Sequence, residues 1–288
     1  GSEMCIRDRY LRRKPAVAGM FYPQEAAEIR SEARTLNEAA AKYLQVRPDL
    51  PADDPQVSGQ VKAVVVPHAG WVFSGMLAAA AWRRAALGRK VTKRIVLLGP
   101  THRVAIRGVA LPGCDQFGTP AGMLAVPTQK VLAQTQDLPL KVTIDPLTHR
   151  DEHALEVQVP LIIENFGEDV ELIPLNVGEA APKAVAEIIA ALTDEETLIA
   201  VSSDLSHYHP YNQAERIDEA TIAQIQNLEL PLTSEQACGV RPLNGLLELC
   251  RQRGVSPRLI GNYNSGDTPY AGSDRVVGYA AFEVRSGS

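Results

Sequence analysis

Three continuous apolar runs, each followed closely by a histidine, constrain the fold of this 288-residue chain most strongly. The runs are residues 61–67, 94–99 and 197–203, and the histidines that follow them are His68, His102 and His207. Uninterrupted apolar runs of this length are typical of strands buried on both faces of a parallel sheet. Because α/β proteins build ligand sites at the carboxyl ends of such strands, we expect the three histidines to converge there.

Helix-like and strand-like segments alternate along the chain. Helices are expected at residues 24–44, 75–87, 153–166, 180–192, 212–228 and 242–252, and further strands at 107–111, 122–126, 140–144, 170–177, 258–263 and 275–284. Without a long linker or a repeat, this pattern predicts one α/β domain over residues 15–288, with a mixed or mostly parallel central sheet and helices on both faces. Residues 1–14 begin with Gly1-Ser2 and lack periodicity, so we expect an expression scar or a disordered tail.

Composition argues against several classes of partner and location. The net charge is −5 and no basic block is interleaved with aromatic residues, which argues against nucleic-acid binding. No apolar stretch reaches the roughly 20 residues of a membrane span. No signal peptide is evident, and the four cysteines show no CxxC spacing. We therefore expect a cytoplasmic protein with reduced thiols.

The strand-end histidines suggest metal binding or proton transfer, because imidazole is the commonest metal-binding side chain and titrates near neutral pH. Two small residues follow His68 and would leave its ring open at a turn. His207 comes three residues after Asp204, so on a helical turn the carboxylate would orient the imidazole as a general base. The alternative for any single histidine is a surface or structural role, which we expect for His209 before Pro210.

Residues 149–153 match the H-x-x-E-H signature of inverted zinc metallopeptidases. The match is short, and Pro146 and Thr148 indicate that the chain is only entering a helix here, which disfavours a peptidase. Glu152 and His153 would nevertheless form an acid/base cluster if they face the site. The alternative is a solvated helix N-terminus, where acidic residues oppose the helix dipole.

Cys238 allows two interpretations. A helix starting near Arg241-Pro242 would place the thiol close to a helix N-terminus, which stabilises a thiolate. Taken alone, the residues slightly favour a buried, inert cysteine.

Six motifs, in order from about residue 15 to 284, closely resemble those of the Memo family. They are VAGMFYP at 17–23, PHAG at 67–70 with SG at 74–75, LGPTH at 98–102, DEHALE at 151–156, SDLSHY at 203–208 and ACG at 237–239. The resemblance implies a fold similar to the class III extradiol dioxygenases, which are non-haem iron enzymes with an α/β core. It also implies a radical-SAM protein as partner, because bacterial members are often grouped with one as component B of the AmmeMemoRadiSam system.

Carried over by residue, the resemblance implies that the metal ligands are His68, His102 and Cys238. Asp204 and His207 would line the same pocket, with Glu152 and His153 nearby, and these four are the expected catalytic residues. The ligand set departs from the two histidines and one carboxylate of the dioxygenases, and a thiolate favours softer metals. Val240-Arg241-Pro242 also stands where Arg-His-Pro is common in the family.

These features predict a metal-dependent redox enzyme that uses Fe(II), with copper or zinc as the other metals, and O2 or a small phenolic or otherwise chelating substrate. One alternative is a non-catalytic module that binds a metal together with a peptide or protein at the same pocket. The other is a zinc-dependent hydrolase, because the same ligands lower the pKa of bound water.

Overall fold

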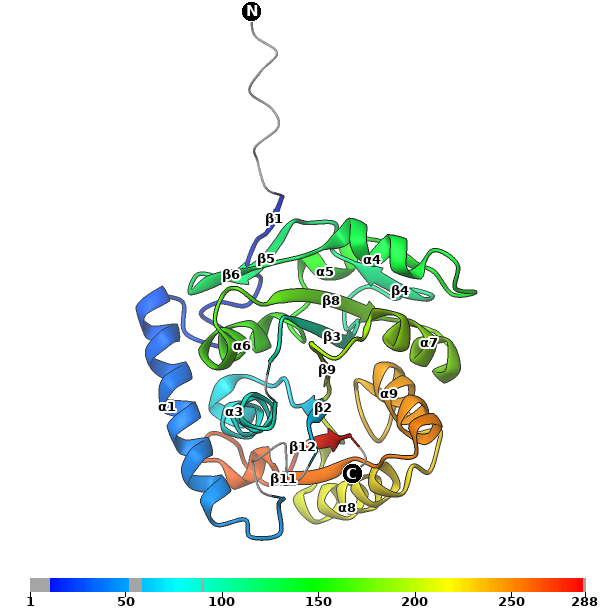
Figure 1. The fold of residues 1–288 in the computed structure, drawn as a ribbon. Coiled ribbons are helices and arrows are strands. Elements are labelled where there is room, and N and C mark those ends of the chain that lie inside the picture. The colour runs from blue at the N-terminus through cyan, green and yellow to red at the C-terminus, as the bar shows by residue number, and fades with distance from the viewer. Residues whose placement is uncertain (1–10, 52–58, 90, 287–288) are drawn as a thin grey trace, which may run out of the picture.

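The computed structural model describes residues 11–51, 59–89 and 91–286, and its centre is a mixed sheet (Figure 1). Within these residues the sheet has nine strands in the order β10-β12-β2-β9-β3-β8-β4-β7, with β11 also paired to β12. The strands are β2 (Val61–Val66), β3 (Arg94–Pro100), β4 (Val109–Leu111), β7 (Val142–Ile144), β8 (Glu171–Val177), β9 (Thr197–Ser202), β10 (His207–His209), β11 (Arg258–Asn264) and β12 (Val276–Arg285).

The four central strands, β2, β9, β3 and β8, are parallel to one another. β12 and β4 run antiparallel on either side of them. The strands at the centre are the continuous apolar runs of the sequence, and they are almost completely buried. This confirms the expected α/β fold with a largely parallel sheet, and it brings the carboxyl ends of β2, β3 and β9 to one edge.

Helices cover both faces of the sheet (Figure 1). Successive side chains of β2 point to opposite faces of the sheet, so two hydrophobic cores form. Val64 and Val66 pack into one core, whereas Ala63 and Val65 pack into the other. Of the helices described, none is both long and apolar enough to cross a membrane. The first core includes residues of α1 (Ala26–Gln45), α3 (Trp71–Leu87) and α6 (Val159–Phe166), and the second includes residues of α4 (Thr128–Thr135), α7 (Pro182–Leu192), α8 (Tyr211–Asn227) and α9 (Val240–Arg253).

The structure corrects the start of the folded unit. Residues 11–14 were assigned to a tail, yet Arg12–Arg13 form β1, which pairs with β5 (Gln116–Thr119) in a small sheet completed by β6 (Gly122–Ala125). Arg13 is buried because its guanidinium finds acceptors inside the protein. The expected scar at residues 1–10 lies outside the described residues.

The expected helix at 153–166 is also shorter than predicted. A short helix, α5 (Pro146–Arg150), precedes an irregular segment at 151–155, and a single 3-10 turn, η1 (Glu156–Gln158), leads into α6. Pro160 lies in the first turn of α6, where a missing N–H costs nothing. Because the segment at 151–155 is not helical, its side chains are able to point toward the edge of the sheet. A second 3-10 turn, η2 (Ser265–Asp267), follows β11.

Candidate metal centre

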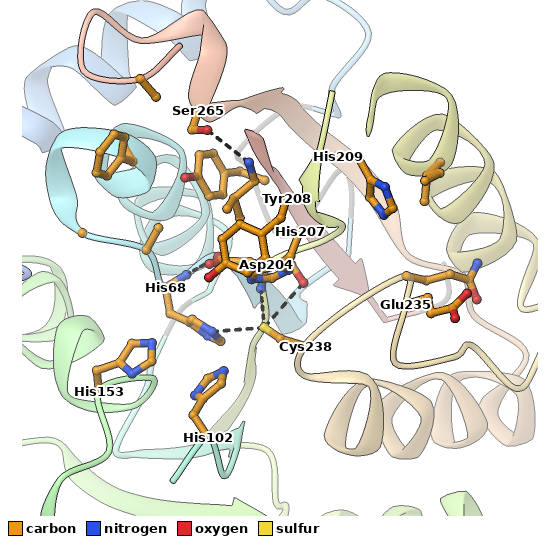
Figure 2. Close-up of a pocket in the computed structure, with 18 of the residues that line it drawn as sticks. His68, His102, His153, Asp204, His207, Tyr208, His209, Glu235, Cys238 and Ser265 are labelled. Atoms are coloured by element: carbon orange, nitrogen blue, oxygen red, sulfur yellow. Dashed lines mark hydrogen bonds between the residues drawn. The ribbon is translucent and has the colours of Figure 1, made fainter. Parts of the chain in front are cut away.

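A cavity of about 1070 Å³ opens at the carboxyl ends of the central strands (Figure 2). Six of the seven residues expected at the site line it, and the seventh, Glu152, is buried and hydrogen-bonded to His102. Aromatic side chains form part of the wall, among them Phe21, Phe73 and Tyr208. The six lining residues are His68, His102, His153, Asp204, His207 and Cys238.

His68 follows β2 and is almost completely buried. Its backbone N–H donates to Asp204 Oδ1 at 2.7 Å, and its Nδ1 lies 2.9 Å from Ser202 Oγ. The Ser202 hydroxyl donates its own proton to Ala154 O at 2.7 Å, so it is left to accept from His68 Nδ1–H. This places the lone pair of the imidazole on Nε2.

Glu152 fixes the position of His102 in the same way. The carboxylate accepts the His102 backbone N–H at 2.6 Å and lies 2.8 Å from His102 Nδ1. Burial alone would raise the pKa of Glu152, but hydrogen bonds and the charge of His102 lower it to about 2. An ionised carboxylate only accepts hydrogen bonds, so His102 Nδ1 carries a proton, and in the neutral ring Nε2 then has the lone pair.

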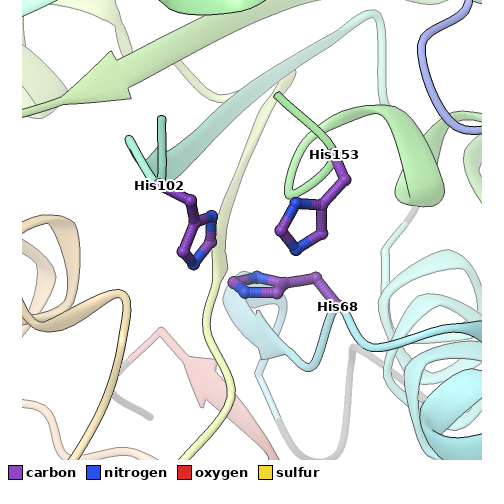
Figure 3. A group of neighbouring side chains, drawn as sticks. All are labelled: His68, His102 and His153. Atoms are coloured by element: carbon purple, nitrogen blue, oxygen red, sulfur yellow. The ribbon is translucent and has the colours of Figure 1, made fainter. Parts of the chain in front are cut away.

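His153 comes from the irregular segment between α5 and η1 and completes a group of three imidazoles (Figure 3). Its ring stacks on His102, with 4.6 Å between the ring centroids, and its Nδ1 lies 3.3 Å from Glu152 Oε1. Each of the three histidines offers one nitrogen, and these nitrogens all lie within 4.8 Å of one another. Imidazoles bound to one ion at about 2.1 Å would hold their nitrogens about 3 to 3.5 Å apart, so small rotations suffice to close the group.

The electrostatics of this group suit a metal ion. Burial, followed by the charge of His102, lowers the pKa of His68 to about 3. Burial, followed by the charge of His68, lowers the pKa of His153 to about 3. Both rings are therefore neutral at physiological pH, and neutral imidazole is the form that binds a metal.

Cys238 lies directly beside this group, two residues before α9. Its Sγ is 3.2 Å from His68 Nε2 and accepts the backbone N–H of Asp204 at 3.3 Å. Burial, followed by the charge of Asp204, raises the pKa of the thiol, so proximity to the helix does not produce a thiolate here. The sulfur therefore contacts His68, but the third donor beside His68 and His102 is His153, and the role of Cys238 as a ligand stays a prediction.

Asp204 and His207 lie in the pocket without the helical turn that was expected between them. Residues 203–206 are irregular, and His207 begins β10. His207 Nδ1 lies 2.8 Å from Leu205 O, so the ring donates to a backbone carbonyl, whereas Asp204 Oδ1 accepts from the His68 backbone. Burial raises the pKa of Asp204, although the hydrogen bond from His68 and the charge of His207 oppose this.

The H-x-x-E-H match does not form a peptidase site. His149 is buried away from the pocket, with Nε2 2.9 Å from Ala110 O, and burial lowers its pKa to about 4. Only His153 of the two signature histidines joins the group of three. Sequence reasoning gave His153 an acid/base role and overlooked Ser202, whose signal was its position at the end of a buried strand.

Comparisons with known proteins find related sequences along almost the whole chain. A family model described as "Memo-like protein" matches residues 13–283. Proteins named "MEMO1 family protein" from Desulfurococcus amylolyticus, Methanococcoides burtonii and Aquifex aeolicus are 29%, 32% and 30% identical to this chain. The alignments cover 94%, 95% and 89% of this chain, and 98%, 100% and 93% of the respective relatives.

Proposed function

The chain belongs to the Memo family, and on that premise we propose that it is a metal-dependent redox enzyme whose ion is bound by His68, His102 and His153. The observation that carries the proposal is the convergence of three imidazoles, two of which have their Nδ1 held by neighbouring side chains. Ser202 and Glu152 engage Nδ1 of His68 and His102, which leaves Nε2 of both rings as a donor. Hydrogen-bond partners behind metal-binding histidines are typical of functional metal sites.

Iron(II) is the ion we favour, with copper or zinc as alternatives, and Cys238 is the proposed further ligand. Three imidazoles and one thiolate suit borderline and softer metals better than magnesium or calcium. A bound redox metal would supply electron transfer and open positions for O2 or a chelating substrate.

The protein's own residues supply binding and proton transfer. The aromatic wall of Phe21 and Phe73 suits a small phenolic ring. His207 donates from Nδ1 to Leu205 O, so its Nε2 is free to accept the proton of a phenolic hydroxyl. Asp204 supports the site from the other side, because its Oδ1 accepts the backbone N–H of His68 at 2.7 Å.

A zinc hydrolase is the second candidate, because three imidazoles with an open position also form catalytic zinc sites. A metal-binding module without catalysis is the third outcome that the experiment below distinguishes. A radical-SAM partner and a peptide occupant of the pocket stay predictions from the family resemblance.

Metal content after anaerobic purification, combined with turnover assays, tests the proposal. Protein loaded with Fe(II), Cu(II) or Zn(II) is assayed for O2 uptake with a panel of catechols and for hydrolysis of activated esters. Uptake that requires Fe(II) or Cu(II) supports the redox enzyme, whereas hydrolysis by the zinc form alone supports the second candidate. Tight metal binding without turnover would indicate the module, and failure to bind any of the three metals would refute the proposal.

A further inference from the structure

The first residues that the structure describes are connected to the metal pocket through a buried carboxylate, that of Glu156. We define residues 11–22 as the N-terminal strap. Glu156, fully buried, accepts four hydrogen bonds from this strap. They come from Arg13 Nη1 at 2.5 Å, Ala16 N at 2.7 Å, Val17 N at 3.0 Å and Tyr22 Oη at 2.6 Å.

The same arginine holds the loop that carries Glu152. Arg13 Nε donates to His149 O at 2.7 Å, and Arg13 Nη2 donates to Glu152 O at 2.7 Å. Segment 151–155 has no helix or strand of its own. Its position is therefore set by contacts with other parts of the chain, and Arg13 and Glu156 hold it at both ends.

The strap also reaches the metal group directly. Phe21 packs against His153, with 4.5 Å between the ring centroids, and its carbonyl accepts the Trp71 N–H at 2.7 Å. Trp71 Nε1 in turn donates to Val157 O at 3.0 Å. The strap thus lies between the start of α3 and the segment that carries two residues of the site.

A buried ion pair alone is weak evidence for stability, because replacing such pairs by apolar residues is often neutral. The Arg13–Glu156 pair, with side chains 5% and 0% exposed, therefore needs another explanation. Arg13 contacts the backbone of His149 and of Glu152, and the side chain of Glu152 orients His102.

We propose that Arg13, Tyr22 and Glu156 are positioning residues, which hold Glu152 and His153 in the geometry that the metal site requires. We call these three residues the Glu156 clamp. The inference rests on the proposed metal-binding function, although its structural part is measurable in metal-free protein. None of the three clamp side chains lines the cavity, so they act through Glu152 and His153.

Amide hydrogen exchange in metal-free protein tests the clamp without a metal. The N–H groups of His102, His153 and Ala154 all donate to Glu152. In Glu156→Gln we expect their exchange to accelerate about tenfold, because the loop opens locally. Tyr22→Phe removes a single hydrogen bond, so we expect exchange of the same amides to accelerate about threefold. This variant replaces Glu156→Gln in the test if Glu156→Gln fails to fold.

The chain provides a matched control in a second buried ion pair, Arg84–Glu283, whose side chains are 4% and 0% exposed. Neither residue lines the cavity. Glu283→Gln should lower the melting temperature about as much as Glu156→Gln does. The exchange rates of the His102, His153 and Ala154 amides should stay unchanged relative to those of the rest of the protein. Equal acceleration in both variants, or none in Glu156→Gln and Tyr22→Phe, would overturn the clamp.

Cobalt(II) binding then links the clamp to the metal site. We expect Glu156→Gln to bind Co(II) about tenfold more weakly, with a shifted visible spectrum, whereas Glu283→Gln binds with the wild-type spectrum. An unchanged affinity and spectrum in Glu156→Gln would refute the link. If wild-type protein binds no Co(II), the proposed function fails, and the exchange data still decide whether the clamp positions Glu152.

Discussion

Glu152 illustrates how one side chain determines the chemistry of its neighbours. It accepts hydrogen bonds from three backbone N–H groups of the site, those of His102, His153 and Ala154. Its negative charge also selects the tautomer of His102. The sequence suggested that Glu152 belongs to the site, but the side-chain direction depends on the irregular segment around it, which no local pattern specifies.

Replacing Glu152 by glutamine should weaken metal binding about 10- to 100-fold, because an amide removes the charge and offers a competing donor. Isothermal titration with Zn(II) or Co(II) measures the effect. Asp151→Asn is the matched control, since the adjacent Asp151 is exposed and pairs only with Arg150 among the contacts described. An affinity of Glu152→Gln equal to that of Asp151→Asn would show that Glu152 does not support the site.

Cys238 provides a second test at this scale. If its sulfur is a ligand, Cys238→Ala should lower Co(II) affinity at least about tenfold and remove the sulfur-to-metal absorption band. Cys250→Ala is the control, because Cys250 is buried in the core and lies outside the pocket. A sulfur-to-metal band that persists in Cys238→Ala would contradict the assignment.

At the scale of elements, the long buried strands were predicted, and so were the short strands β4, β6 and β7, whereas β1, β5 and β10 were missed. β2, β3 and β9 match the apolar runs within one residue, because burial on both faces requires uninterrupted apolar sequence. β1, β5 and β10 have only two to four residues, and β1 and β10 pair with strands far away in the sequence, so the three carry no comparable local signal. The same reason explains why the tail was expected to extend to residue 14.

The start of α9 depends on a close backbone approach at Gly239. A Cβ added there would lie 2.6 Å from Ser203 Cβ and 2.7 Å from Ser202 O. Gly239→Ala should therefore lower the free energy of unfolding by about 1 to 3 kcal/mol and displace Cys238 from His68. Urea denaturation measures this, with Gly272→Ala as control, because a Cβ at Gly272 meets nothing within 4 Å. Equal stability of the two variants would show that the contact relaxes without cost.

For the whole molecule, the parallel sheet explains how distant segments form one site. β9 lies between β2 and β3, so His68 and His102 follow strands on either side of it, and Asp204 follows β9 itself. The strand-end rule predicted this convergence for His68, His102 and His207. It did not predict His153, because that residue precedes α6 on an irregular segment and is brought in by the N-terminal strap and Glu156.

In the proposed site, one metal ion binds between His68, His102 and His153. Anomalous diffraction at the absorption edge of the metal, from crystals of protein loaded with one equivalent of Fe(II) or Zn(II), tests it most directly. We predict a single strong peak about 2.0 to 2.3 Å from one nitrogen of each of the three rings. A peak held by other residues, or no peak in the pocket at saturating metal, would contradict the account.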